Sequence, residues 1–291
     1  MRRSITSAIL SLLLCLSLWP RSTSAQALAT VVVTREAPTA RGLLAWWRAM
    51  PGLSSGLLWY DLLGRTPGTL TNMGAGAGWA PTTRPGGQGE VRFDGSNDRV
   101  AVPVAPYLEP PAMTMMLWIK AVSWGASDVR ALFTINAGGG VLREITVNTT
   151  GHLAVYLAAT GGLALVDPAP TALAIGTWYH IAVTYDQVDG LRVYINCQPE
   201  ATAAATGTLV VTNVAGAFGM NVTSFNRFFN GAMDDMRFYN RVVPRPELCT
   251  IMRDSQRGEP TLFRPPALIL GLPTSTSAGA GGGFLPFFHT P

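Results

Sequence analysis

The chain has 291 residues, a formal net charge of +4, 13% charged residues and 48% hydrophobic residues. Lys120 is the only lysine, and no run of Lys and Arg indicates a nucleic-acid-binding surface. The low charge and the abundance of Ala, Gly, Thr and Val favour an exported β-protein over a cytosolic enzyme.

The first 25 residues have the pattern of a secretory signal peptide. Arg2 and Arg3 form a positive n-region, an apolar run ends at Trp19, and Ala25 closes a small-residue cleavage signal. The apolar run is too short to span a membrane, although an uncleaved N-terminal anchor is the alternative. Cleavage removes three arginines and no acidic residue, so the formal net charge falls from +4 to +1. We therefore expect a secreted, extracellular protein without a stable membrane span.

After the signal peptide, residues 26–41 are expected to form a lead-in linker, and residues 42–253 to form one β-domain without internal repeats. The predicted strands begin at 43–47 and continue through 113–120, 131–136, 143–149, 152–157, 163–166, 178–185, 191–195, 209–212 and 217–222. Gly- and Pro-containing turns separate these short strands, which is typical of an antiparallel two-sheet sandwich. Pro244 to Met252 predicts one short helical turn with Pro at its start. Residues 254–291 are expected to be an irregular tail rich in Pro and Gly.

The central hairpin carries the strongest strand pattern in the sequence. From Trp178 to Tyr185, aromatic and β-branched residues alternate with a period of two, so that Ile181 and its alternate neighbours share one face. A turn that ends at Gly190 follows, and the alternation then resumes through Ile195. This segment predicts an antiparallel hairpin with a five-residue loop.

The hairpin, TWYHIAVTYDQVDGLRVYINC, resembles the run TWYHVAVTYDG…LYVNG of the laminin-G-like family of concanavalin A-like sandwiches. Two further stretches resemble the same family in the same order: Phe93 to Val100 matches its FDGSDDYV strand entry, and Phe229 to Arg241 matches its closing strand. The three matches span Gly42 to about Arg253. The resemblance implies an all-β fold, an antiparallel jelly-roll sandwich of two sheets.

The same fold includes glycan hydrolases, whose motif resembles E-x-D-x-x-E, because retaining chemistry needs two carboxyls about 5 Å apart. No stretch of this chain has that spacing, and Glu144 stands alone in its predicted strand. Asp234 and Asp235 are adjacent, so a regular strand would point them to opposite faces. The sequence also lacks a G-x-S-x-G elbow and a Cys/His zinc pattern, and His180 occupies a position where the family itself often has His. We therefore predict no enzymatic activity.

The resemblance implies one structural calcium ion, because relatives often hold calcium between the FDG loop and the Asp of the closing strand. By motif position, Asp234 would supply a carboxylate, and Asp94 or Gly95 would supply a side-chain or carbonyl oxygen. Alternatively, Asp94 and Asp98 cap the tight turn through Gly95, and Asp234 pairs with Arg237.

Exposed aromatic residues are the candidates for stacking on sugar rings. Those in predicted loops are Trp79, Trp124 and Tyr107, whereas Trp46, Trp118 and Trp178 lie in strand patterns and are expected in the core. The alternative for all six is packing, since aromatic side chains dominate protein cores.

Signal cleavage would remove Cys15 and leave Cys197 and Cys249, an even number in an oxidising compartment. Cys197 stands where the family usually has the Gly of its VNG run. We predict one disulfide between the two cysteines, and two separate buried thiols are the alternative.

These observations favour a secreted, non-catalytic recognition or adhesion module that binds a glycan or another extracellular macromolecule, and they do not favour nucleic acid as a partner. The alternative from another class is a structural component of an extracellular or particle surface. A glycan hydrolase with an unrecognised site is the third possibility.

Overall fold

The computed structural model describes residues 38–50, 56–74, 78–126, 128–137, 140–223 and 226–258. The predicted signal peptide, residues 1–25, lies outside the described residues, as do the predicted linker up to residue 37 and the predicted tail from residue 259. A short 3-10 turn, η1 (Pro38–Ala40), falls at the end of the predicted linker. Among the described residues, no helix combines the length and the apolar character needed to cross a membrane.

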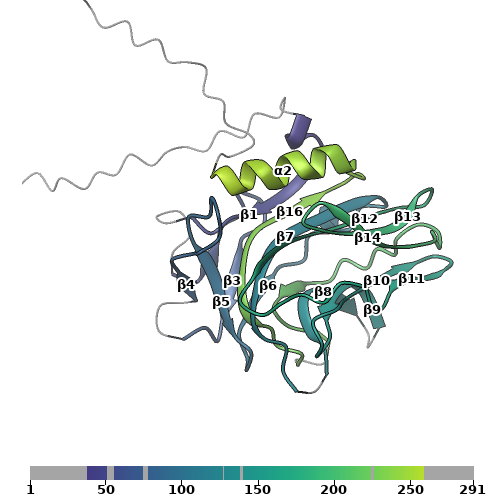
Figure 1. Ribbon diagram of the computed structural model, residues 1–291. Helices are drawn as coiled ribbons and strands as arrows, with labels where there is room; N and C mark the ends of the chain where they lie inside the picture. The colour runs from purple at the N-terminus through teal and green to yellow at the C-terminus, as the bar shows by residue number, and fades with distance from the viewer. Residues whose placement is uncertain are drawn as a thin grey trace, which may run out of the picture.

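The described strands form two antiparallel sheets that face each other, which confirms the predicted sandwich (Figure 1). Sheet A has the order β14 (Gln198–Ala203), β13 (Gly190–Ile195), β12 (Trp178–Asp186), β7 (Met113–Ser123), β16 (Asn230–Tyr239), β5 (Glu90–Asp94) and β4 (Trp79–Ala80), with β1 (Leu43–Trp47) also paired to β16. Sheet B has the order β11 (Gly162–Val166), β10 (Leu153–Ala159), β9 (Gly140–Val147), β8 (Arg130–Ala137), β15 (Gly216–Phe218), β6 (Arg99–Val102), β3 (Gly68–Thr71) and β2 (Leu58–Trp59). A second 3-10 turn, η2 (Pro106–Leu108), precedes β7.

The core between the sheets follows the alternation read from the hairpin. Ile181 and Val183 of β12 are fully buried there, opposite Ile195 and Val193 of β13. Burial of such side chains is the main favourable term in folding, at about 25 cal/mol per Å² of apolar surface. The strands of the hairpin and their facing are therefore confirmed. The predicted five-residue loop is wrong, because β12 and β13 pair as far as Asp186 and Gly190 and leave three residues, 187–189, between them.

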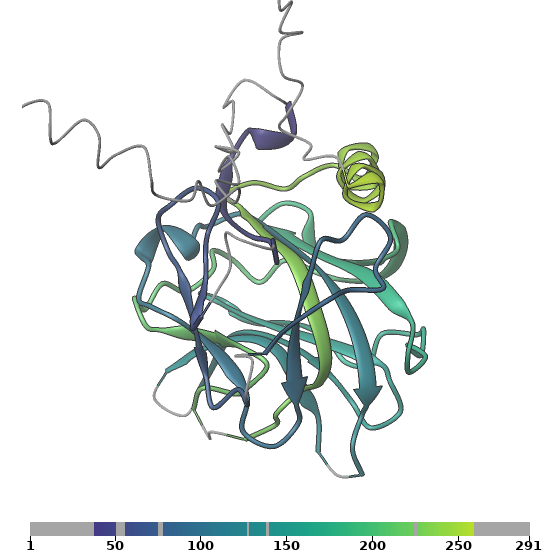
Figure 2. The ribbon, with the colours of Figure 1, turned by 90° about the vertical axis from the view of Figure 1, so that its left-hand side faces the viewer.

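Helix α2 (Arg245–Arg257) follows the last strand and is longer than the predicted turn. It begins after Pro244, whose lack of an N–H is harmless at a helix start, and it ends at Gly258 with a left-handed φ of 74°. The predicted domain boundary at residue 253 therefore falls inside a helix. The helix covers the outer face of sheet A (Figures 1 and 2), where its Leu248 and Ile251 join a second apolar cluster with Trp46 of β1.

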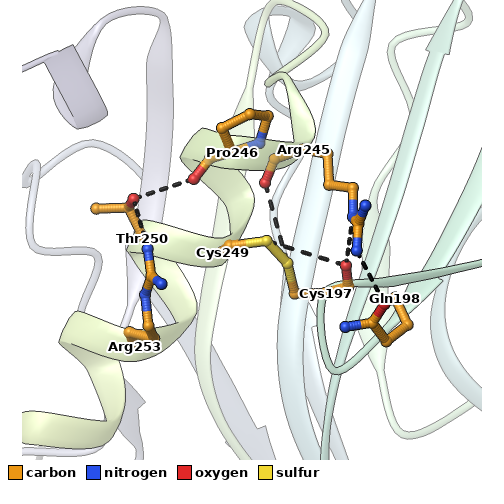
Figure 3. Close-up of a disulfide and its surroundings, with 7 residues drawn as sticks. All are labelled: Cys197, Gln198, Arg245, Pro246, Cys249, Thr250 and Arg253. Carbon is orange, nitrogen blue, oxygen red and sulfur yellow. Dashed lines mark hydrogen bonds between the residues drawn. A yellow bond between two sulfur atoms is a disulfide. The ribbon is translucent and has the colours of Figure 1, made fainter.

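The predicted disulfide is present and attaches α2 to the turn between β13 and β14 (Figure 3). The Cα atoms of Cys197 and Cys249 are 5.2 Å apart, within the range that a disulfide spans. Asn196 and Cys197 both have left-handed φ values, 50° and 67°, as a two-residue type I′ hairpin turn requires. Gly adopts such a φ most easily, and Gly is the residue that the family resemblance implies at the position of Cys197. Arg245 of α2 strengthens the attachment, because its Nε donates to the carbonyl of Cys197 at 3.0 Å.

Candidate functional site

Asp234 and Asp235 lie in the middle of β16, and the structure corrects the prediction that they face opposite sides of the sheet. The pairing of β16 with β7 shifts register between Asp234 and Arg237, and Asp235 has a φ of 53°. Such a β-bulge adds one residue to a strand and re-aims its side chain. Both carboxylates consequently reach the outer face of sheet A, beneath α2.

The two aspartates are held by different arginines. Asp234 Oδ2 accepts from Arg84 Nη2 at 2.6 Å and from Arg84 Nε at 2.9 Å, while Asp234 Oδ1 accepts from the backbone N–H of Ala49 at 2.8 Å. Asp235 Oδ1 accepts from Arg237 Nε at 2.9 Å and from the Trp46 indole N–H. The predicted alternative pairing of Asp234 with Arg237 is therefore wrong. Arg84 stands alone in a Pro- and Gly-containing loop, so no sequence pattern indicated its role.

Burial acts on both aspartates, but neighbouring charges divide them. Desolvation raises the pKa of Asp234 to about 6, although the charge of Arg84 opposes that rise. Desolvation also favours a higher pKa at Asp235, but the guanidinium groups of Arg237 and Arg84 outweigh it and hold the pKa of Asp235 well below its usual range. Asp235 is therefore an ionised structural anchor, and Ser255 of α2 donates its hydroxyl to the same carboxylate.

The residues predicted to share a calcium ion do not come together. In the pairing of β16 with β5, Asp94 lies opposite Asn230, four positions from Asp234, which is about 13 Å along a strand. Asp234 is fully buried and its carboxylate is already bound by Arg84, so it does not fit the role of a calcium ligand. Calcium at the turn of Asp94 and Gly95 stays a prediction.

That turn has the alternative geometry that the sequence allowed. Asp94 Oδ1 accepts from the backbone N–H of Ser96 at 2.8 Å, and Asp98 Oδ2 accepts from the backbone N–H of Asp94 at 2.9 Å. Gly95, with a φ of 80°, occupies the left-handed position between them. The two aspartates therefore cap a tight turn at the entry to β6.

The aromatic candidates separate into buried and accessible residues. Trp124, expected in an exposed loop, is buried and donates its indole N–H to the carbonyl of Leu173 at 3.1 Å. Trp178, expected in the core, is only partly buried on the outer face of sheet A, with the Lys120 ammonium 5.0 Å from its ring centre. The predicted exposure of both tryptophans is wrong, because the loop of Trp124 folds inward and the strand of Trp178 turns that side chain to the outer face of its sheet.

Three further aromatic candidates, Trp46, Trp118 and Tyr107, are buried or partly buried. Trp46 and Trp118 are buried as predicted, but both lie on the outer face of sheet A. Trp46 donates to Asp235, and the Arg84 guanidinium lies 5.3 Å from the ring centre of Trp118. Tyr107 is partly buried, with the Arg65 guanidinium 5.8 Å from its ring centre.

Trp79 in β4, at the edge of sheet A, is the aromatic candidate with open space on both sides. One pocket of about 420 Å³ is lined by Ala49, Met50, Trp79, Ala80, Pro81, Gln88 and Gly89. A second pocket of about 380 Å³ is lined by Gly74, Gly78, Trp79, Ala80, Arg92, Phe93, Asp94 and Asp98. The indole is held in place, since its N–H donates to the carbonyl of Gly56 at 3.0 Å and its ring packs edge-on against Trp59 at 6.4 Å. We call these two pockets and their residues the Trp79 site.

Asp98 gives the second pocket an unsatisfied polar group. Its side chain is only 5% exposed, and while Oδ2 accepts from Asp94, Oδ1 has no hydrogen-bond partner in the protein. Burial raises the pKa of Asp98, the bond from the Asp94 backbone lowers it, and the charge of Asp94 raises it further. A buried oxygen of this kind calls for a donor from a ligand or water. Arg92, in contrast, is engaged by Glu90 at 2.7 Å.

The Trp79 site combines an immobilised ring with carboxylate acceptors. Apolar pockets with a few placed polar groups are the usual form of small-molecule sites, and an indole offers a large rigid contact surface. Such a site suits a ligand that has an apolar face and hydroxyl donors. Within the described ranges, no group of three or more His, Cys, Asp or Glu residues could hold a metal ion.

The fold and site define a two-sheet antiparallel sandwich with two pockets beside Trp79 at the edge of sheet A. Residues 94–249 match the laminin-G-like family model described as the concanavalin A-like lectin/glucanases superfamily. The chain therefore belongs to this superfamily, as its hairpin and closing strand predicted. A comparison with curated proteins finds no match.

Solved structures share the fold at low sequence identity. The chain is similar to a Trypanosoma rangeli sialidase in complex with 2,3-difluoro-KDN, at 14% identity and a TM-score of 0.58, over 77% of this chain and 34% of that one. It is also similar to domain 4 of AbnA, a GH43 extracellular arabinanase from Geobacillus stearothermophilus, in complex with arabinotriose, at 17% identity and a TM-score of 0.55, over 72% of this chain and 98% of that one. The botulinum neurotoxin serotype D binding domain matches at 10% identity and a TM-score of 0.56, over 73% of this chain and 51% of that one. The chain thus spans about a third of the length of the sialidase.

Proposed function

We propose that this protein is a secreted, non-catalytic recognition module that binds carbohydrate at the Trp79 site. The observation that carries the proposal is the juxtaposition of a fixed, partly accessible indole with the buried, unpartnered Oδ1 of Asp98. The indole would contact the C–H face of a sugar ring, and Asp98 would accept a hydrogen bond from a ring hydroxyl.

The superfamily supports the same class of ligand. Its description includes lectins. Domain 4 of AbnA, which matches this chain over 98% of its own length, was solved with arabinotriose. At 17% identity this likeness extends to the fold alone, so it supports carbohydrate as a class and does not select a sugar.

The non-catalytic part of the proposal rests on how the carboxylates are used. Asp234 and Asp235 are bound by arginines under α2, and Asp94 and Asp98 each use one oxygen to cap the turn. A glycosidase needs an acid and a second carboxylate that both face the scissile bond. None of these four side chains is arranged in that way.

A glycan array with the full chain tests the proposal, followed by calorimetric titration of the best hit. Trp79→Ala is expected to reduce affinity at least tenfold, and Asp98→Asn to reduce it less. Trp178→Ala is the matched control, because Trp178 is a partly accessible tryptophan on another face of the molecule. Circular dichroism of each variant shows whether the fold is kept.

Equal binding by Trp79→Ala and the wild type would contradict the assignment of the site. Uniform silence across the array would instead favour the alternative of a structural component of an extracellular or particle surface. Turnover of a polysaccharide by the wild type would contradict the non-catalytic part.

The calcium prediction is revised to the turn of Asp94 and Gly95, with Asp98 as the second carboxylate in place of Asp234. Two carboxylates and a carbonyl are few for an ion that takes 6–8 oxygens, so water or a sugar hydroxyl would have to complete the shell. An ion that binds only the folded state raises the melting temperature. Titration of calcium into chelator-treated protein checks this, and Asp98→Asn should abolish any rise. If added calcium does not change the melting temperature, the calcium prediction is wrong.

A further inference from the structure

The outer face of sheet B carries a second pocket, separate from the Trp79 site. Helix α2 lies on sheet A (Figure 1), whereas the segment after β15 lies over the centre of this face, where Val222 donates to Thr134 and Asn221 donates to Glu144. Toward β6 the face is partly exposed, at Arg99 and Ala101. One row of side chains crosses the face in register from β3 to β11: Thr69, Ala101, Ala217, Thr134, Glu144, Tyr156 and Leu165. Small residues occupy the β6 and β15 positions of that row, which leaves room above them.

The acidic centre of the row is already compensated. Glu144 is 1% exposed and accepts from Asn221 Nδ2 at 3.1 Å, from Asn136 Nδ2 at 3.4 Å and from Arg227 Nη1 at 3.4 Å. Its charge is therefore balanced by one guanidinium and two amides. A carboxylate that accepts hydrogen bonds from a guanidinium and two amides repels a nearby anion less than an isolated carboxylate does.

The pocket lies beside this centre and has a volume of about 390 Å³. It is lined by Arg99, Ala101, Asn136, Val214, Ala215, Gly216, Ala217, Met220 and Val222. The volume is within the range of small-molecule pockets, about 300–1,000 Å³. Small and apolar residues make up the walls, and Arg99 and Asn136 are the two polar side chains in the lining.

Arg99 is the only charged residue of the lining, and it forms no hydrogen bond or ion pair with any residue in the part of the chain that the structure describes. A guanidinium offers five donors in a planar fork that matches a carboxylate bidentately. The pocket is therefore electropositive and has an unused carboxylate-binding group at its wall.

Asn136 supplies the group that would distinguish a sugar from a simple anion. It is 7% exposed, and it uses one N–H toward Glu144 and one oxygen lone pair toward the backbone N–H of Leu142 at 3.2 Å. A side-chain amide has two N–H donors and two lone pairs, so one donor and one acceptor remain. A hydroxyl group can use both at once.

From these contacts we propose that the pocket on the outer face of sheet B binds a hexuronic acid. The carboxylate pairs with Arg99, a ring hydroxyl bonds to Asn136, and the C–H groups of the ring pack on the small walls from Ala101 and Ala217. The choice of a sugar acid rather than another carboxylate rests on the proposed function. The pocket gives the protein an acidic-sugar site distinct from the Trp79 site, whose carboxylates favour neutral sugars.

The test is titration of the full chain with D-glucuronate and D-galacturonate, followed by NMR or calorimetry. Arg99→Gln is expected to weaken binding of the uronate at least tenfold, because it removes the charge without breaking a hydrogen bond or ion pair between described residues. Arg192→Gln is the matched control, since it removes one exposed arginine at the other sheet. D-Glucose and acetate are the ligand controls, and both are expected to bind at least tenfold more weakly than the uronate in this pocket.

Several results would overturn the proposal. If the wild type binds neither uronate, the proposed site does not exist. If Arg99→Gln binds the uronate as tightly as the wild type does, the proposed site does not exist either. Acetate binding as tightly as the uronate would define a general anion site instead. Uronate binding lost in Trp79→Ala and kept in Arg99→Gln would move the acid to the Trp79 site, and so would separate failure of this pocket from failure of the carbohydrate-binding function.

Discussion

The two outer faces of the sandwich use polar residues in opposite ways. On sheet A, α2 and the disulfide cover a cluster in which Asp234 and Asp235 each have a buried arginine partner. On sheet B, the wall of the pocket retains an arginine, Arg99, without a described partner. The covered face thus uses its charges to hold the fold, whereas the open face leaves charge available for a ligand. The acidic residues of the closing-strand motif, Asp234 and Asp235, belong to the covered face, whereas Asp98 and Arg99 of the other motif line pockets.

The largest effect is expected from breaking the covered cluster. Asp235→Ala leaves Arg237 buried without its carboxylate and also removes the acceptor of the Trp46 indole. Removing one partner of a buried ion pair costs about 3–5 kcal/mol. We expect that loss in the free energy of unfolding, measured with urea. Asp189→Ala breaks an exposed pair with Arg192 and should cost less than about 1 kcal/mol. If both variants lose a similar free energy of unfolding, the buried pair contributes no more than the exposed pair, and the expectation is wrong.

The second effect concerns the attachment of α2. The disulfide closes a loop with a sequence separation of 52 residues, and such cross-links typically contribute about 2–4 kcal/mol. We expect Cys197→Ser combined with Cys249→Ser to lower the free energy of unfolding by that amount. The same variant should retain sugar binding at the Trp79 site, because the disulfide holds the start of α2, whereas the loop beside that site packs at Gly86 against the end of the helix. Loss of binding with the fold intact would show that the covered face also serves the ligand.

The third effect is a pH dependence that arises beneath α2. Burial lowers the pKa of His180 to about 3, with Asp235 opposing that shift, so the folded state keeps the ring neutral. The unfolded state binds a proton below about 6.5, and stability is therefore lost as the pH falls from that value toward 3. At pH 5 the contribution of His180 is about 2 kcal/mol of lost stability.

Asp234 acts in the opposite direction, because its folded-state pKa of about 6 lies above its ordinary value of 3.8 and the folded state takes up the proton first. His180→Phe isolates the histidine, since it keeps a ring against Trp118 and removes the titration. The variant should lose less stability than the wild type between pH 7 and pH 5, as measured by urea unfolding at each pH. Equal losses would mean that His180 titrates normally.

The smallest effect is expected on the open face. Arg99→Gln should change the free energy of unfolding by less than about 0.5 kcal/mol, as surface substitutions without a structural partner do. Thermal melting beside the wild type measures this. A loss comparable to that of Asp235→Ala would show that Arg99 holds the fold and would remove the distinction between the two faces.

Local pattern was sufficient for most of the strands. The predicted strand at 209–212 is wrong, since Leu209 forms only an isolated bridge with Ala159, and β14 was not predicted. The period-two alternation around Ile181 placed that residue in the core, because side chains of a strand must alternate and one face has to be buried. The two cysteines that remain after the expected signal cleavage were also enough to predict the disulfide. The length of α2 was underestimated, since its end depends on packing beneath the helix as well as on local signals.

The site depended on contacts that no local pattern contains. The alternation rule failed at Asp235, because a bulge turned that side chain to the same face as Asp234. Arg84 is 150 residues from Asp234, so only the folded chain could reveal their pairing. Trp79 and Asp98 likewise meet across a turn that the sequence assigned to calcium. By itself the sequence determined most of the strands through periodicity, the family through its resemblance in three motifs, and the disulfide through the two remaining cysteines. Which charges are buried in pairs and which face a pocket was decided only by tertiary structure, since burial and electrostatic balance arise from groups brought together from distant parts of the chain.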